Sequence, residues 1–81
     1  MNRIYIVTRK TRNGNVVERA FSSKEKADVF CKNYLYYKST LEDRTYNRIQ
    51  IDEYSGGFIE YSLYTNEFGE ITLTVKKIIL D

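Results

Sequence analysis

Apolar side chains recur every three to four residues between positions 27 and 37, and this period predicts one amphipathic helix. Ser22 and Glu25 precede the run with capping-box spacing, so we expect the Ser22 hydroxyl to accept the backbone N–H of Glu25. The helix is predicted to end between residues 38 and 40. Its core-facing stripe comprises Ala27, Phe30, Cys31, Tyr34, Tyr37 and Leu41.

The residues before this helix have the pattern of a β-hairpin. Residues 3–11 contain a β-branched and aromatic run, and residues 16–21 form the second strand. Asn13-Gly14 lies between them and is the preferred pair for a two-residue type I′ turn, since both residues tolerate positive φ. That turn would place Arg9 opposite Glu18 as a cross-strand ion pair.

Two further strands flank a glycine-rich turn in the second half of the chain. Residues 48–52 alternate between polar and apolar side chains, and we extend this strand to residues 46–54. The next strand is predicted over residues 58–65, with Ile59, Tyr61 and Leu63 facing inward. A three-residue loop at 55–57 pairs Ile51 with Tyr61 and keeps the apolar side chains on one face. We therefore predict a hairpin with this register.

The last strand is predicted over residues 71–80, after a turn at 66–70 in which Gly69 takes a left-handed conformation. This turn would place Leu73 opposite Leu63. The alternation breaks at Lys76, which indicates a bulge or a change of partner strand.

These elements predict an α+β fold with the order strand-strand-helix-strand-strand-strand. One helix packs on a mostly antiparallel sheet, and residues 1–81 form a single domain. The helix covers one face of the sheet, and the other face is open unless a partner covers it.

Composition narrows the class of protein. The 42% hydrophobic and 15% aromatic content argues against disorder. No apolar run approaches the ~18 residues of a membrane span. The N-terminus lacks the apolar core of a signal peptide, and a single cysteine cannot form an internal disulfide. We expect a cytoplasmic protein.

Charge divides the chain into two parts. Residues 1–48 hold eleven Lys/Arg and five Asp/Glu, whereas residues 49–81 hold two Lys/Arg and six Asp/Glu. Such a split can create two surfaces of opposite sign, or it can be cancelled when folding brings the halves together.

The sequence contains no catalytic set. Histidine is absent, which removes the commonest general base and metal ligand. Cys31 falls on the apolar helix stripe and is expected in the core. Asp52 and Glu53 are adjacent on a strand, so their carboxylates point to opposite faces. We expect no enzyme activity, no cofactor and no metal.

The chain is rich in tyrosine, with eight in 81 residues, and this is the feature of its composition that points most directly to a binding function. Tyrosine is enriched at binding hot spots, but small domains also use it at the edge of the core. We expect Tyr34, Tyr37 and Tyr61 to be core residues. The predicted protein-binding residues are Tyr36, Tyr54, Tyr64 and Phe58.

Basic residues crowd the first hairpin and suggest an alternative function. Arg9, Lys10, Arg12 and Arg19 could grip the phosphates of a nucleic acid. The same residues could equally protect a strand edge from unwanted pairing. A third expectation is a homodimer joined through residues 71–80, whose apolar strand would be a hazard if it formed a bare edge.

The N-terminal half resembles a group of small bacterial and phage accessory proteins of unassigned function. The resemblance covers residues 3–35 and rests on the strand Tyr5-Ile6-Val7 and the helix entry at residues 21–27, Phe-Ser-Ser-Lys-Glu-Lys-Ala. It implies a phage or prophage accessory protein that binds and inhibits a host or defence protein. The group brings no catalytic residues to carry over.

Overall fold

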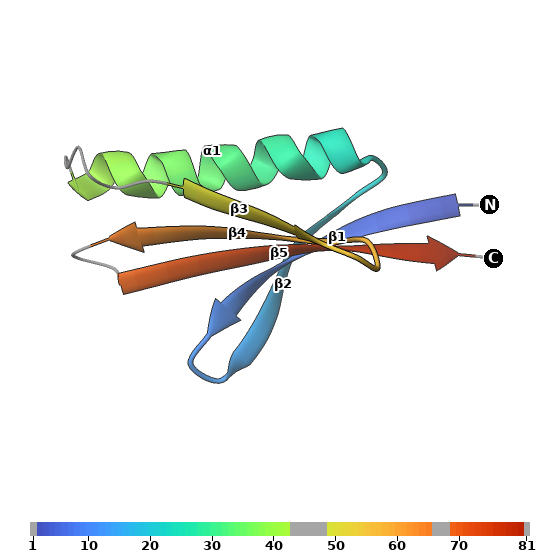
Figure 1. Cartoon of the computed structure of the whole chain (residues 1–81), viewed down its shortest axis with the longest axis horizontal. Helices are drawn as coiled ribbons and strands as arrows, with labels where there is room; N and C mark the ends of the chain where they lie inside the picture. Colours follow the sequence, from blue (N-terminus) through green and yellow to red (C-terminus); the bar gives the residue numbers. More distant parts are fainter. Residues whose placement is uncertain (1, 43–48, 66–68, 81) are drawn as a thin grey trace.

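The computed structural model describes residues 2–42, 49–65 and 69–80. The five strands form one antiparallel sheet in the order β2-β1-β5-β4-β3, and α1 lies along one face (Figure 1). This confirms the predicted α+β architecture. The elements are β1 Asn2–Thr11, β2 Gly14–Phe21, α1 Lys24–Glu42, β3 Ile49–Tyr54, β4 Phe58–Thr65 and β5 Gly69–Leu80. Predictions about residues 43–48 and 66–68 lie outside the described residues.

The core lies between α1 and the sheet. Tyr37, expected in this core, is instead 61% exposed, and Leu35 takes its place. At 3.6 residues per turn, Leu35 lies within about 40° of Cys31 around the helix, whereas Tyr37 lies about 120° away. The buried apolar residues are Ala27, Cys31 and Leu35 of α1, with Val7, Ile59, Tyr61, Leu63, Leu73 and Val75 of the sheet.

The helix begins one residue later than the capping box predicted. Its first residue is Lys24, and the Ser23 hydroxyl accepts the backbone N–H of Lys26 at 3.2 Å. Ser23 is therefore the N-cap, and the predicted pairing of Ser22 with Glu25 is wrong. Because β2 stays paired to its last residue, Ser22 is needed to carry the chain from the sheet to the helix layer.

The first hairpin has a two-residue loop, but it is not the predicted one. Thr11 pairs with Gly14, so the loop residues are Arg12 and Asn13. The Thr11 hydroxyl donates to the Gly14 carbonyl at 2.6 Å and accepts the Asn13 N–H at 3.3 Å. Gly14 has a φ of 123°, which a residue with a side chain rarely adopts. The Thr11 hydroxyl thus stabilises this loop over the alternative.

A β-bulge shifts the register of the β1–β2 pairing by one residue beyond Thr8. The pairing shifts between Val7 and Thr8, and Glu18 of β2 is left without a partner opposite it. Arg9 lies on the turn side of this bulge and is opposite Val16 because Thr11 pairs with Gly14, so the predicted opposition of Arg9 and Glu18 is wrong. The ion pair itself is confirmed, because Arg9 Nε reaches Glu18 Oε1 at 2.9 Å.

The predicted register is confirmed for the β3–β4 hairpin and is wrong for the β4–β5 hairpin. Ile51 lies opposite Tyr61, as the three-residue loop required. Leu73 lies opposite Tyr61 and not opposite Leu63, so the β4–β5 register is displaced by two residues from the prediction. A shift of two keeps every side chain on the same face, so alternation cannot distinguish the two registers. Gly69 has the predicted positive φ, at 73°.

β5 lies in the middle of the sheet, between β1 and β4. Residues 73–76 pair on both sides, and residues 77–80 continue along β1 after the pairing with β4 ends at Lys76. The predicted change of partner is therefore seen at Lys76, without a shift of register. Residues 71–80 are not a bare edge strand, because residues 73–76 are paired on both sides and residues 77–80 are paired with β1 on one side.

Candidate functional site: the open face of the sheet

The sheet has one face that α1 does not cover (Figure 1). No other described element lies over it. Its side chains alternate along each strand with those that contact the helix. We define the open face by its residues Ile6, Thr8 and Lys10 of β1, Thr74, Lys76 and Ile78 of β5, Phe58, Glu60 and Tyr64 of β4, and Asp52 and Tyr54 of β3, with Glu70 at the start of β5.

A stacked aromatic pair stands at one end of the open face. Tyr54 and Phe58 lie opposite each other across β3 and β4, with ring centroids 4.7 Å apart and planes inclined by 13°. The turn between them is closed by Gly56 and Gly57, both with positive φ. The backbone N–H of Lys77 donates to the Gly57 carbonyl at 3.1 Å. The turn is thereby fixed to β5, and the aromatic pair is held in place.

Tyr64 lies toward the other end of β4 and is 57% exposed. A hydrogen bond with Glu70, which lies opposite, raises the pKa of Tyr64. The negative charge of Glu60 likewise raises the pKa of Tyr54, whose side chain is 46% exposed. Both phenols keep their protons at neutral pH. Both present an aromatic surface, and Tyr54 can also donate its hydroxyl to a binding partner, whereas the Tyr64 hydroxyl donates to Glu70.

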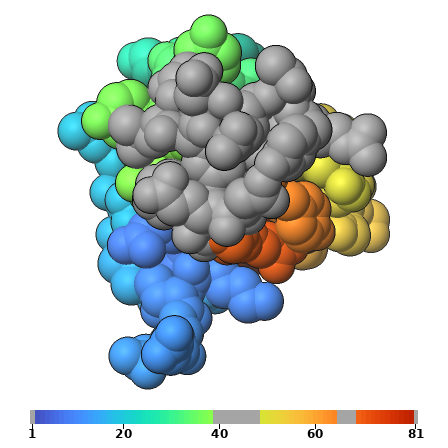
Figure 2. Space-filling model, turned by 90° about the vertical axis from the view of Figure 1, so that its left-hand side faces the viewer, coloured from blue at the N-terminus to red at the C-terminus, as the bar shows by residue number. Residues whose placement is uncertain are grey.

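A groove of about 430 Å³ crosses the open face beside the aromatic pair. Ile6, Phe58 and Ile78 give it an apolar lining. Lys76 lies between Ile6 and Phe58, and Thr8 and Thr74 form the neighbouring row. One end is walled by the β1–β2 hairpin, which bends away from α1 and projects from the body of the molecule (Figures 1 and 2). The groove therefore joins the first hairpin and the β3–β4 turn, which are far apart in sequence.

Sequence reasoning missed the aliphatic part of this groove. Residues 4–7 of β1 are apolar at both alternating positions, and so are residues 78 and 79 of β5. A strand with apolar residues on both sides indicates that both of its faces meet apolar surroundings. That signal could have placed Ile6 and Ile78 beside the predicted aromatic residues.

The four predicted protein-binding residues do not share one surface. Tyr54, Phe58 and Tyr64 lie on the open face, as described above. Tyr36 is 67% exposed, but it belongs to α1, on the opposite side of the sheet. Tyr36 therefore lies on a different surface from the other three, because the helix layer and the sheet separate them. Tyr61 is buried as expected.

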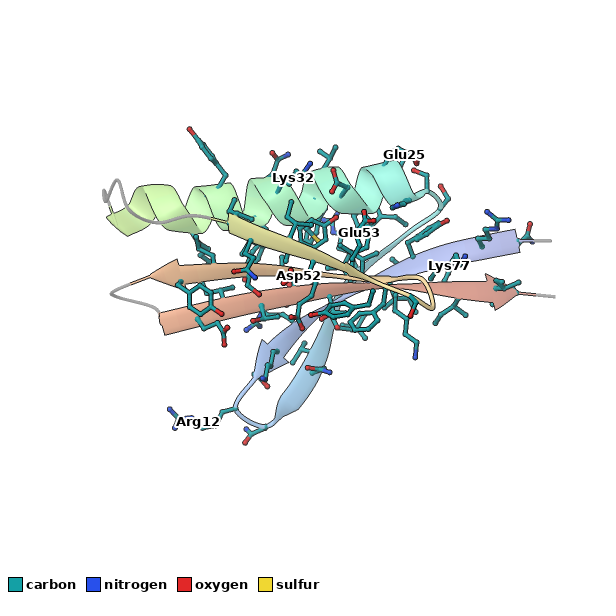
Figure 3. The ribbon with its side chains drawn as sticks, in the orientation of Figure 1. Arg12, Glu25, Lys32, Asp52, Glu53 and Lys77 are labelled. Carbon is teal, nitrogen blue, oxygen red and sulfur yellow. The ribbon has the colours of Figure 1, made fainter. Side chains whose placement is uncertain are left out.

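The four basic residues of the first hairpin are also divided between faces. Arg9 is paired with Glu18, and the Arg19 guanidinium lies 5.8 Å from the ring centroid of Phe30 on α1. Lys10 points to the open face, and Arg12 lies at the tip of the hairpin (Figure 3). The structure therefore does not bring these cations together into one phosphate-binding surface.

Within the described residues, the groups that could support chemistry are few. Burial raises the pKa of Cys31 to about 12, so its thiol stays protonated and is a poor nucleophile. No group of three or more His, Cys, Asp or Glu in these residues could hold a metal ion. A second hollow lies on the helix side, but its volume of about 150 Å³ is below the ~300–1,000 Å³ of ligand pockets.

No helix in the described part of the chain combines the length and apolar character needed to cross a membrane. In comparisons with protein-family models, curated proteins and solved structures, the chain has no match.

Proposed function

We propose that this protein is a small non-enzymatic interaction module that binds another protein through the open face. The observation that carries the proposal is the stacked pair Tyr54–Phe58 beside an apolar groove, on a face that no described element covers. Antiparallel sheets with a solvated face usually carry polar side chains there. Fully buried interface centres are instead enriched in aromatic residues.

The resemblance of residues 3–35 to small phage accessory proteins suggests the class of partner. We extend the proposal to a phage or prophage protein that acts in the cytoplasm on a host or defence protein. A domain of this size inhibits most simply by occupying a surface that its target needs. The hairpin and the β3–β4 turn border the groove and would contact the rim of that target.

The proposal can be tested by tagging the protein in its source cell and identifying what co-purifies by mass spectrometry. The same capture is repeated with Tyr54→Ala and Tyr64→Ala, and with Tyr36→Ala as the matched control on α1. Recovery of a stoichiometric partner should fall at least about tenfold for the two open-face variants, as expected for hot-spot tyrosines. The control should recover it normally.

Thermal unfolding separates binding from folding in this experiment. All three tyrosines are substantially exposed, so each variant should keep a melting temperature close to that of the unmodified protein. Equal recovery of the partner with all three variants would contradict the proposal.

A further inference from the structure

The charges of the open face fall into two separate halves. Among the described residues, its cations are Lys10 of β1 and Lys76 of β5. Its carboxylates are Asp52 of β3, Glu60 of β4 and Glu70 at the start of β5. Asp52 and Glu60 lie directly opposite each other, which concentrates negative charge at the β3 side. Apart from Glu70, which is hydrogen-bonded to Tyr64 at the start of β5, the face is therefore bipolar, with its cations on β1 and β5 and its carboxylates on β3 and β4.

These charges are not neutralised by ion pairs with one another. The three ion pairs between described residues join Arg9 to Glu18, Lys24 to Glu53 and Lys32 to Asp28. None of these six residues belongs to the open face. Its two halves thus remain available to charges of opposite sign on another molecule.

The size of the open face matches that of a stable interface. Five strands spaced about 4.8 Å apart, each about eight residues long, give a face of roughly 600 Å². A standard interface buries about 800 Å² per partner, and the projecting hairpin adds to the flat area. Two sheets commonly pack face to face over an apolar layer about 10 Å thick.

We infer that the open face packs against the open face of a second copy of this chain, forming a two-fold symmetric homodimer. In such a dimer the same patch meets itself with its halves exchanged. Lys10 and Lys76 of each copy then face Asp52 and Glu60 of the other, and the groove of each copy, which lies mainly over β1 and β5, is covered by β3 and β4 of the other. The inference goes beyond the proposed function, which uses the same face, and it names a second copy of this chain as the occupant.

Charge reversal tests this arrangement in the full-length protein. The double variant Lys10→Glu/Lys76→Glu has an entirely negative open face, and Asp52→Lys/Glu60→Lys has a largely positive one. The control Arg3→Glu/Lys26→Glu makes the same net change as the first variant at exposed positions outside the open face, at the start of β1 and of α1. Sedimentation velocity and light scattering at about 100 mM salt, where screening is incomplete, report the assembly.

The unmodified protein and the control should sediment as dimers of twice 9.6 kDa. Each open-face variant alone should have its dimer dissociation constant raised at least tenfold, because like charges face each other. An equimolar mixture of the two variants should form the heterodimer, because every charged contact is then complementary. Circular dichroism verifies that each variant is folded.

An unmodified protein that stays monomeric at 100 µM would overturn the inference, as would open-face variants that dimerise like the control. If the protein is monomeric while Tyr54→Ala still loses a captured partner, the inference fails and the proposed function stands. If charge reversal abolishes the dimer while Tyr54→Ala leaves partner capture unchanged, self-association stands and the proposed binding of another protein fails.

Discussion

Replacing Tyr61 by Phe should measure how firmly the helix is attached to the sheet. The Tyr61 ring is 1% exposed at the centre of the core, and its hydroxyl donates to Asp28 Oδ1 on α1 at 2.5 Å. Phenylalanine keeps the ring and its packing and removes only this hydrogen bond. The variant therefore isolates one polar contact between the two layers.

The expected loss follows from the surroundings of Asp28. Hydrogen bonds to charged groups contribute about 1.5–3 kcal/mol, and more is lost when the remaining group stays buried. The Asp28 side chain is 33% exposed and also pairs with Lys32 at 3.0 Å, so water and Lys32 still satisfy it in the variant. We therefore expect Tyr61→Phe to lower the free energy of unfolding by the low end of this range, about 1.5 kcal/mol. For a domain of this size that lowers the melting temperature by roughly 6–12 °C.

The loss should depend on pH. Burial raises the pKa of Asp28, but the hydrogen bond from Tyr61 and the charge of Lys32 outweigh it, so the pKa lies below its ordinary value. A carboxyl whose pKa is depressed in the folded state stabilises the fold above its unfolded pKa of about 3.9 and loses that contribution as pH falls through the folded pKa. The difference between Tyr61→Phe and the unmodified protein should be complete at pH 7 and shrink in acid.

Thermal unfolding followed by circular dichroism, at pH 7 and at steps below pH 4, measures both effects. Tyr64→Phe serves as the matched control, because its hydroxyl lies on the exposed face and its removal should change stability by less than about 0.5 kcal/mol. The reasoning would be refuted if Tyr61→Phe melted like the control at pH 7. A deficit that stayed constant through the acid range would refute the role assigned to the Asp28 carboxylate.

Three further outcomes follow from the fold. Ser23→Ala should cost about 1 kcal/mol in urea unfolding because it removes the N-cap, whereas Ser22→Ala should cost little. Leu35→Ala should lower the free energy of unfolding by about 2–5 kcal/mol, and Val29→Ala, on the exposed side of α1, by less than about 1 kcal/mol. If the hairpin binds nucleic acid, Arg12→Glu should weaken retardation of DNA or RNA and flatten its salt dependence. No retardation at low salt would exclude that alternative.

Local signals predicted the elements of this fold because they act within a few residues. The 3.6-residue period located α1, and the alternation of residues 49–54 with 58–63 fixed the β3–β4 register. Two adjacent serines, however, can both act as caps, and the sequence does not say which one the strand leaves free. The first turn likewise had two possible positions. The loop forms at Arg12-Asn13 and not at Asn13-Gly14, because the Thr11 hydroxyl stabilises the earlier position.

The order of the strands in the sheet could not be derived from such local signals. The position of β5 between β1 and β4 depends on pairings between residues about 70 positions apart, and alternation along one strand does not name its neighbours. For the same reason, the sequence does not say whether Tyr36 shares a surface with Tyr54 and Tyr64. Outward orientation can be inferred from period alone, but whether two outward residues share a surface depends on which layer each element occupies.

The central position of β5 also explains how the charge asymmetry of the sequence reaches the surface. Lys76 and Lys77 are the only basic residues in the acidic part of the chain, residues 49–81. Because β5 is inserted beside β1, Lys76 joins Lys10 and the basic N-terminal strands, while Asp52 and Glu60 remain on β3 and β4. Folding therefore keeps the positive and negative charges of the open face on different strands and does not mix them. A face with opposite charges on its two halves is the arrangement that a two-fold axis makes self-complementary, and this connects the order of the strands to the dimer we infer.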